Sequence, residues 1–418
     1  MVRPNEVFEL HESAVRSYCR GVPMVFARAQ GHHLWDIDGQ RYTDLLCGAG
    51  ALNYGHNHPE MVRRVTAYLA AGGPIQSLDL YTTAKAEFLE RFAGTVLAPR
   101  GMSDYVMQFP GPAGTLAVEA ALKLARKVTG RTQVVAFTGG FHGASLGSLA
   151  VTSSRLLRGG AGTQLPDVTF LPYGDRLGAA EAVRDALRSA PPAAVILETV
   201  QGEGGLNAAD PDWLAAVRRY ADEAGALVIV DDIQAGCGRT GDFFSFDRYP
   251  GLRPDLICLS KSLSGLGLPL AALLIRREHD QWAPGEHNGT FRGNNLAFVA
   301  ATAALELWDE ADFLAQVAAL THAVGASLEA VAESLLPGLA QVAGRGAMRG
   351  LRFADAGLVQ RIQKGLLRAG IVAESSGEGR VLKVLPPLTM PLADWAALAS
   401  TLGDVIVDTA TPSAVASV

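Results

Sequence analysis

A lysine and an aspartate each follow a short apolar run, and they lie 30 residues apart in the chain. Residues 226–230 are apolar and lead to Asp231, and residues 256–259 lead through one serine to Lys261. Apolar runs that end abruptly in polar residues are typical of strands buried on both faces of a parallel sheet. A lysine at such a strand end is desolvated, so its pKa falls and its amine becomes free to form a Schiff base.

The aspartate complements this chemistry. A buried carboxylate needs a positive partner, and a protonated pyridine nitrogen is one. In pyridoxal phosphate (PLP) chemistry the protein contributes two groups. One is a lysine that binds the aldehyde of the cofactor, and the other is a carboxylate beside its pyridine nitrogen. The alternative is a buried ion pair between Asp231 and Lys261 that only joins two strands. The chain holds six lysines against thirty arginines, so a lysine is not its default cation.

A glycine loop that runs into a helix offers a phosphate site. Residues 111–114 precede a segment whose apolar residues, among them Val118 and Leu122, fall on one face of a helix. The first turn of a helix has free backbone N–H groups and the positive end of the dipole, and small residues let an anion approach. Gly114 and Thr115 are the natural donors. The alternative is an ordinary helix start without a ligand.

Two further buried strands also end in aromatic or polar side chains. Residues 133–137 form one of them, and Phe141 and His142 follow it in a loop. A flat ring at a strand end can stack on a flat cofactor, although a core phenylalanine and a solvated histidine would give the same pattern. Residues 194–197 form the other strand, which leads to Glu198.

Together these segments resemble the signature of the class III (omega) aminotransferases. The signature lies in residues 231–241, Asp-Asp-Ile-Gln-Ala-Gly-Cys-Gly-Arg-Thr-Gly, and in residues 260–265, Ser-Lys-Ser-Leu-Ser-Gly. The chain departs from it at Asp232, where most of the class has glutamate. The resemblance extends over about residues 12–390. Three segments are similar to the diaminobutyrate–2-oxoglutarate transaminase branch in particular, namely residues 48–56, 198–205 and 289–293.

The resemblance implies a fold-type I PLP enzyme and a role for each cofactor residue. Lys261 would hold PLP and move a proton between substrate and cofactor, and Asp231 would keep the pyridine nitrogen protonated. Phe141 would cover the ring, with His142 beside it. Gln234 would bind the phenolic oxygen of the ring.

The resemblance also implies active sites shared between subunits. Gly114 and Thr115 would bind the cofactor phosphate of their own subunit, and Thr290 would reach the phosphate of the neighbouring subunit. The protein would then be an obligate homodimer. Arg292 replaces a small residue found in many relatives, and it would either bind a substrate carboxylate or only pair across the dimer.

Several residues are implied to lie near the substrate. In relatives, the Glu203 position can pair with an arginine of the C-terminal domain, and this pair blocks or admits a substrate carboxylate. Lys383 stands in place of that arginine, as in the diaminobutyrate branch, and offers a point charge instead of a bidentate fork. Ala49 and Asn53 belong to a loop that enters the site, or to a purely structural loop. The substrate candidates are Glu198, Glu203, Ala49, Asn53, Arg292 and Lys383.

By this resemblance the enzyme interconverts L-aspartate 4-semialdehyde plus L-glutamate and L-2,4-diaminobutyrate plus 2-oxoglutarate. The same site could serve another omega-amine, such as ornithine, 4-aminobutyrate or an amino sugar. A NAD-dependent oxidoreductase is a third alternative, because residues 236–241 match G-x-G-x-x-G. That match is weak, since its glycines begin five residues after Asp231 and no helix pattern follows.

Composition excludes several classes of partner. The chain has 418 residues, a net charge of −6 and no basic run, which argues against nucleic acid. Its four cysteines are widely spaced and fit neither a metal motif nor a disulfide framework. No apolar signal segment opens the sequence, and no run approaches the ~20 residues that a membrane span needs. We expect a cytoplasmic protein without metal or membrane.

Length and pattern predict how the elements position these residues. Alternating strands and helices over residues 60–309 predict an α/β, PLP-binding major domain with a mostly parallel sheet. Residues 310–418 predict a smaller α+β minor domain, and residues 1–59 predict a segment that packs with it. The chain ends together would thus form the second domain.

Overall fold

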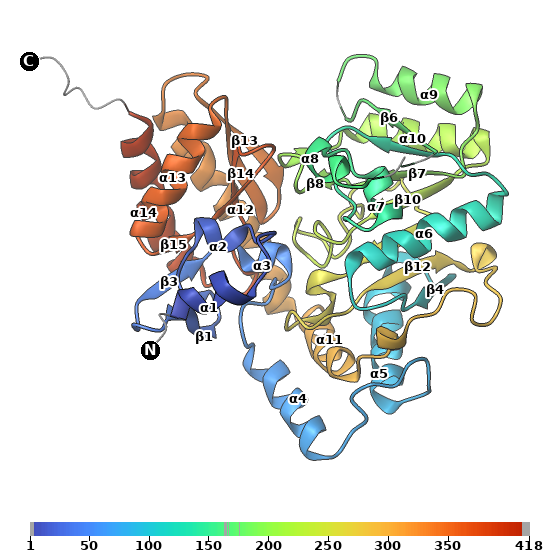
Figure 1. The fold of residues 1–418 in the computed structure, drawn as a ribbon, viewed down its shortest axis with the longest axis horizontal. Coiled ribbons are helices and arrows are strands. Elements are labelled where there is room, and N and C mark those ends of the chain that lie inside the picture. The colour runs from blue at the N-terminus through green and yellow to red at the C-terminus, as the bar shows by residue number, and fades with distance from the viewer. Residues whose placement is uncertain (1–3, 163–164, 166, 175, 412–418) are drawn as a thin grey trace, which may run out of the picture.

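The computed structural model describes residues 4–162, 165, 167–174 and 176–411 (Figure 1). Its larger part is built on seven strands, which are β4 (Tyr105–Gln108), β5 (Val134–Phe137), β6 (Val168–Leu171), β7 (Ala194–Leu197), β10 (Leu227–Asp231), β11 (Leu256–Leu259) and β12 (Ala272–Arg276). Their order in the sheet is β4-β12-β11-β10-β7-β5-β6. Of these seven strands only β12 runs in the opposite direction to the others, so the predicted mostly parallel sheet is confirmed.

Both faces of this sheet are buried under helices. Ile229 of β10 joins the apolar cluster beneath α6 (Gly114–Thr129), and Val230 joins the cluster beneath α10 (Pro211–Ala224). The alternation follows from the two-residue period of a strand. α9 (Ala179–Ser189) packs beside α10 on the second face (Figure 1). Because every residue of β10 is buried, this strand is held rigidly between the two layers.

The carboxyl ends of the parallel strands meet at one edge of the sheet. Asp231 ends β10, Lys261 follows β11 after one serine, and Glu198 directly follows β7. Phe141 and His142 come from the loop after β5. Ligands of α/β sheets bind at this edge, so the topology gathers the predicted side chains where chemistry is expected.

The smaller part combines both ends of the chain. Its main sheet is antiparallel and has, in spatial order, the strands β13 (Ala340–Arg345), β14 (Met348–Phe353), β17 (Val381–Val384) and β16 (Glu374–Ser376). A second sheet consists of β1 (Phe26–Gln30), β2 (His33–Asp36), β3 (Arg41–Asp44) and β15 (Ile371–Val372), and it joins the N-terminal segment to the C-terminal one. The predicted α+β unit from the chain ends is confirmed. Its borders at residues 59 and 310 stay a prediction.

Helices complete the two parts. Those of the smaller part are α12 (Ala311–Ser334), α13 (Ala356–Arg368) and α14 (Leu392–Ala410). The remaining helices are α1 (Pro4–His11), α2 (Tyr18–Gly21), α3 (Cys47–Gly50), α4 (Pro59–Ala70), α5 (Thr83–Phe92), α7 (Leu146–Val151), α8 (Arg155–Gly159) and α11 (Asn295–Leu307). Short helical turns and bridging strands are η1 (Ala93–Leu97), η2 (Ala98–Arg100), η3 (Lys261–Ser264), η4 (Arg277–His279), η5 (Thr290–Arg292), β8 (Val200–Gln201) and β9 (Asn207–Ala208).

Among the described residues, α12 alone is long and apolar enough to cross a membrane, with a mean hydropathy of 1.3 in its most apolar window. The sequence analysis had predicted no such segment. A single helix of this kind is weak evidence, because core helices share these properties. Leu320, Val324 and Leu328 of α12 are fully buried in one cluster with Trp395 of α14. One face of α12 is therefore packed in the core of the smaller part.

Arg239 ties three segments of the chain together. It lies in the turns that follow β10, is fully buried, and donates from Nε and Nη2 to Oδ1 of Asn53 at 2.9 and 2.6 Å. Its Nη1 donates to the carbonyl oxygens of Pro386 (2.6 Å) and Ala347 (3.3 Å). The turns around Arg239 contain no helix. The context that a dinucleotide fingerprint needs is therefore absent from this described stretch.

Replacing Arg239 with methionine should destabilise the fold. The R239M variant leaves Asn53 Oδ1 and the Pro386 carbonyl buried without donors, so we expect the free energy of unfolding to fall by about 3 kcal/mol. Denaturant unfolding at a fixed protein concentration measures this change. R63M is the matched control, because Arg63 is mostly exposed. Equal midpoints for both variants would contradict the role given to Arg239.

Candidate active site

Lys261 stands at the bottom of a cavity at the carboxyl edge of the large sheet. It begins η3 with a φ of 49°, a left-handed conformation that is strained for a residue with a side chain. Its Nζ donates to the carbonyl oxygen of Ala49 at 2.9 Å. Burial, and next the positive charge of Lys383, lower the pKa of Lys261 from 10.5 to about 8. The neutral, nucleophilic form of the amine is thus a minor fraction near neutral pH and becomes the main form above about pH 8.

Asp231 is oriented by a histidine. Its Oδ2 lies 2.7 Å from Nδ1 of His142, and both side chains are almost completely buried. Burial alone would lower the pKa of His142, but the hydrogen bond and charge of Asp231, together with the charge of Glu198, raise it above its ordinary value. The backbone N–H of Ile233 donates to the other oxygen, Oδ1, at 3.2 Å. A carboxylate fixed in this way can hold a proton on a ligand atom.

Glu198 organises the loops around the cavity. Its Oε2 accepts from the backbone N–H of Phe141 and its Oε1 from that of Gly202, both at 3.1 Å. Burial raises the pKa of Glu198 to about 7, with the charge of His142 opposing and that of Asp231 supporting the change. Its two oxygens are thus used to position the Phe141 loop and the turn that carries Glu203.

The beginning of α6 fits an anion. The residue before the helix, Ala113, has no side chain that could cap the free N–H groups. Gly114 lies against the next segments so closely that a Cβ atom there would be 3.0 Å from Cδ1 of Ile233 and 3.3 Å from Cβ of Ser260. Thr115 Oγ1 is 2.6 Å from the hydroxyl oxygens of two serines, Ser145 and Ser148. Because Gly114 and Thr115 also line the cavity, the uncapped N–H groups of this helix start can receive a phosphate.

The cavity has a volume of about 260 Å³. It combines an amine of lowered pKa, a fixed carboxylate, an aromatic ring and an uncapped helix start, which together fit PLP. Of the predicted site residues it is lined by Gly114, Thr115, Phe141, His142, Glu198, Glu203, Asp231, Gln234 and Lys261.

Four other predicted residues lie differently. Ala49 contributes its carbonyl oxygen, which accepts from both Lys261 and Gln234. Asn53 is fully buried and is engaged by Arg239 and by the carbonyl oxygen of Cys237. Thr290 and Arg292 lie on η5 and do not line the cavity around Lys261. Thr290 accepts at its carbonyl from Gln76, and Arg292 pairs with Asp79.

Lys383 is fully buried behind Glu203, which lines this cavity. Its Nζ lies 3.0 Å from Oε1 of Glu203 and 3.2 Å from Oε1 of Gln234. Glu374, which the sequence analysis did not select, lies 2.9 Å away on the other side. The signal that could have found it is the Gly-Glu-Gly turn at residues 377–379, which predicts a hairpin that sets Glu374 against Lys383.

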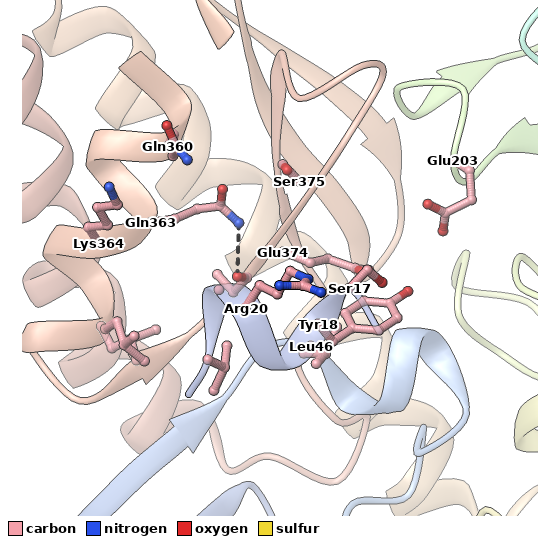
Figure 2. Close-up of a pocket in the computed structure, with 15 residues that line it drawn as sticks. Ser17, Tyr18, Arg20, Leu46, Glu203, Gln360, Gln363, Lys364, Glu374 and Ser375 are labelled. Atoms are coloured by element: carbon pink, nitrogen blue, oxygen red, sulfur yellow. Dashed lines mark hydrogen bonds between the residues drawn. The ribbon is translucent and has the colours of Figure 1, made fainter. Parts of the chain in front are cut away.

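A second cavity has a volume of about 490 Å³ and shares Glu203 with the first. Tyr18 and Arg20 of the N-terminal segment line it together with Glu374 (Figure 2). In Figure 2, Glu203 comes from the green part of the chain and faces Glu374 and Tyr18 across the opening. These residues were also absent from the sequence-based selection, apart from Glu203, because they carry no local motif.

Comparisons with known proteins agree with this geometry. Residues 16–406 match the family Aminotransferase class-III. The chain is 47% identical to diaminobutyrate–2-oxoglutarate transaminase of Virgibacillus pantothenticus over 92% of this chain and 94% of that protein. It is 50% identical to an uncharacterized aminotransferase of Sinorhizobium fredii over 91% and 87% of the two chains. The crystal structure of ornithine aminotransferase from Toxoplasma gondii is similar in fold, with a TM-score of 0.85, 23% identity and coverage of 96% and 94%.

The lowered pKa of Lys261 predicts how the protein takes up its cofactor. Covalent uptake of PLP by the apo-protein should accelerate as the pH rises and level off above about 8, because the neutral amine is the reactive form. Borohydride trapping followed by intact-mass measurement gives the rate, and K261A should show no label at this site.

Lys383 should tune that midpoint. Its positive charge lowers the pKa of Lys261, so the midpoint should move to higher pH in K383M. K364M is the matched control, because Lys364 is an exposed lysine of the neighbouring cavity. A midpoint at the ordinary lysine value in the unchanged protein would reject the desolvated-amine argument.

Proposed function

Since the chain belongs to the class-III aminotransferases, we propose that it interconverts L-2,4-diaminobutyrate plus 2-oxoglutarate and L-aspartate 4-semialdehyde plus L-glutamate. The enzyme is an aminotransferase and PLP is its cofactor. The observation that carries the proposal is the placement of Lys261 and Asp231 in one cavity, in a chain 45–49% identical to several diaminobutyrate–2-oxoglutarate transaminases.

PLP, when bound, supplies an aldehyde that accepts the amino group and a ring that withdraws electrons from the reacting carbon. Lys261 would be the group that takes a proton from the substrate carbon and delivers it to the carbon that carried the aldehyde. Asp231, oriented by His142, holds the proton on the ring nitrogen. Phe141 covers the ring face, and the start of α6 at Gly114 binds the phosphate.

The charges beyond the ring suit amino-acid substrates. Lys383 provides a buried cation for a carboxylate, and Glu203 and Glu374 provide anions near a second amino group. Gln234 donates to Glu203 at 3.2 Å and accepts from Lys383, so it links the ring site to these charges. The cofactor role that we propose for Gln234 is a hydrogen bond to the phenolic oxygen.

A half-reaction tests the substrate. L-2,4-diaminobutyrate added without an oxo acid should convert the cofactor, with loss of absorbance near ~420 nm and growth near ~330 nm. We expect kcat/KM about tenfold above that for ornithine or 4-aminobutyrate. A preference for another amine would reject diaminobutyrate and favour the alternative omega-amine. No response to any amine by the PLP-loaded protein would reject the function.

The role proposed for Asp231 can be tested with the neighbouring Asp232 as the control. D231N should slow the half-reaction about a hundredfold or more, because the charge on the ring nitrogen loses its counter-ion. D232N should change the rate little, since Asp232 accepts from the backbone N–H of Ser245 and does not line the cavity around Lys261. Equal effects of the two variants would contradict the role of Asp231.

We also propose that the protein is a homodimer whose subunits share their active sites. We propose the cytoplasm as its compartment. Thr290 lies outside its own cavity, and the surface around it exposes Tyr81 fully, Phe291 by 68% and Leu80 by 64%. An apolar surface of this kind supports contact with a second copy. The four cysteines are free and three of them are buried, which supports a reducing compartment.

Mixed dimers test the sharing. K261A and T290D should each be inactive as homodimers, the second because its carboxylate would repel the phosphate. A heterodimer of the two contains one site with an intact Lys261 and an intact Thr290, so it should recover about half of the unchanged activity. If each Thr290 served its own subunit, the heterodimer would be inactive. Differently tagged copies allow its purification.

A further inference from the structure

Lys383 has two carboxylate partners that are built into the protein in different ways. Glu374 stands directly opposite Lys383 in the antiparallel ladder between β16 and β17. Cross-strand neighbours of this kind are fixed by the register of the sheet. The side chain of Glu374 is 7% exposed and that of Lys383 is fully buried. This pair is thus part of the rigid smaller sheet.

Glu203 approaches the same ammonium from the larger part of the chain. It sits in a turn between Gly202 and Gly204, and its side chain is 32% exposed to the two cavities. The two glycines are closely packed and fix the backbone of this turn, but the Glu203 side chain borders both cavities and can rotate into them. Glu203 can therefore move away from Lys383, whereas Glu374 cannot.

A fully buried ammonium without a counter-ion is strongly unfavourable. If Glu203 were the sole partner, its departure would leave such a charge, and the Glu203–Lys383 contact could not open easily. Glu374 reduces this penalty, because the charge of Lys383 opposes the rise in the pKa of Glu374 that burial causes. Burial alone would lower the pKa of Lys383, yet the charges of Glu374 and Glu203 raise it, so the ammonium keeps its proton.

We propose that Glu374 is the permanent counter-ion of Lys383 and thereby allows a substrate carboxylate to replace Glu203 at Lys383. Glu374 is a positioning residue in this scheme, because it acts through Lys383. The inference rests on the proposed function only in requiring a substrate that carries a carboxylate beside its reacting carbon, as L-glutamate and 2-oxoglutarate do.

The proposal has a kinetic signature. Glu374 repels Glu203 and the incoming carboxylate to a similar degree, so its charge largely cancels in the equilibrium between them. It stabilises the intermediate state in which neither of them contacts Lys383. Loss of the charge should therefore slow exchange in both directions without a matching change in affinity. Other charged or titratable groups near this cluster include Lys261, Tyr18 and Arg20.

The test uses the PLP-loaded E374Q enzyme and glutarate, an unreactive dicarboxylate. Stopped-flow absorbance of the cofactor should give association and dissociation rates that both fall about tenfold, with a dissociation constant that changes less than about threefold. E374D keeps the charge and should restore much of both rates. E378Q, an exposed carboxyl in the same hairpin, should match the unchanged enzyme within about twofold.

The half-reactions provide a second measurement. In E374Q the L-glutamate half-reaction should slow about tenfold while the diaminobutyrate half-reaction changes little, because its reacting carbon carries no carboxylate. Equal slowing of both half-reactions, or a weaker glutarate affinity at unchanged rates, would overturn the proposal. Failure of diaminobutyrate in the unchanged enzyme would reject the proposed function alone, since the glutarate and glutamate measurements do not depend on that donor.

Discussion

Buried charge has to be balanced, and this constraint governs the cavity around Lys261. The amine of Lys261 is kept reactive by burial and by the cation of Lys383, but a second buried cation is tolerable only with anions beside it. Glu203 and Glu374 supply those anions. The nucleophile and the carboxylate-binding cation are thus parts of one electrostatic arrangement, and neither can be changed without an effect on the other.

The two parts of the fold contribute to this arrangement in different ways. The large parallel sheet provides positions at strand ends, where the backbone is rigid but side chains face a cavity. The smaller antiparallel sheet provides a cross-strand ion pair whose geometry is set by register. Arg239 holds the N-terminal segment and the smaller part against the turns that follow β10. These hydrogen bonds of Arg239 help to hold Glu203 of the larger part near Lys383 of the smaller part.

Local sequence patterns were enough to predict individual strands and helices and the residues at their ends. The apolar runs before Asp231 and Lys261, and the glycine loop before Thr115, each predict an element and the residue at its end. These apolar runs and the glycine loop do not single out Glu374, whose alignment with Lys383 follows from the hairpin turn at residues 377–379. They could not predict that Asn53 would be occupied by Arg239, since that bond joins residues 186 positions apart in the chain. Long-range contacts of this kind leave no periodic signal.

The resemblance implies that Lys383 takes the place of an arginine, and the partners that Lys383 meets give this choice a physical rationale. An ammonium has three N–H donors on one atom, and three oxygens, from Glu203, Glu374 and Gln234, lie within 3.2 Å of Nζ. A guanidinium spreads its charge over a plane and favours one bidentate carboxylate. A point charge between two carboxylates and an amide can instead exchange one partner while it keeps the others. The departure from the class pattern at residue 383 and the presence of Glu374 opposite it are therefore explained together.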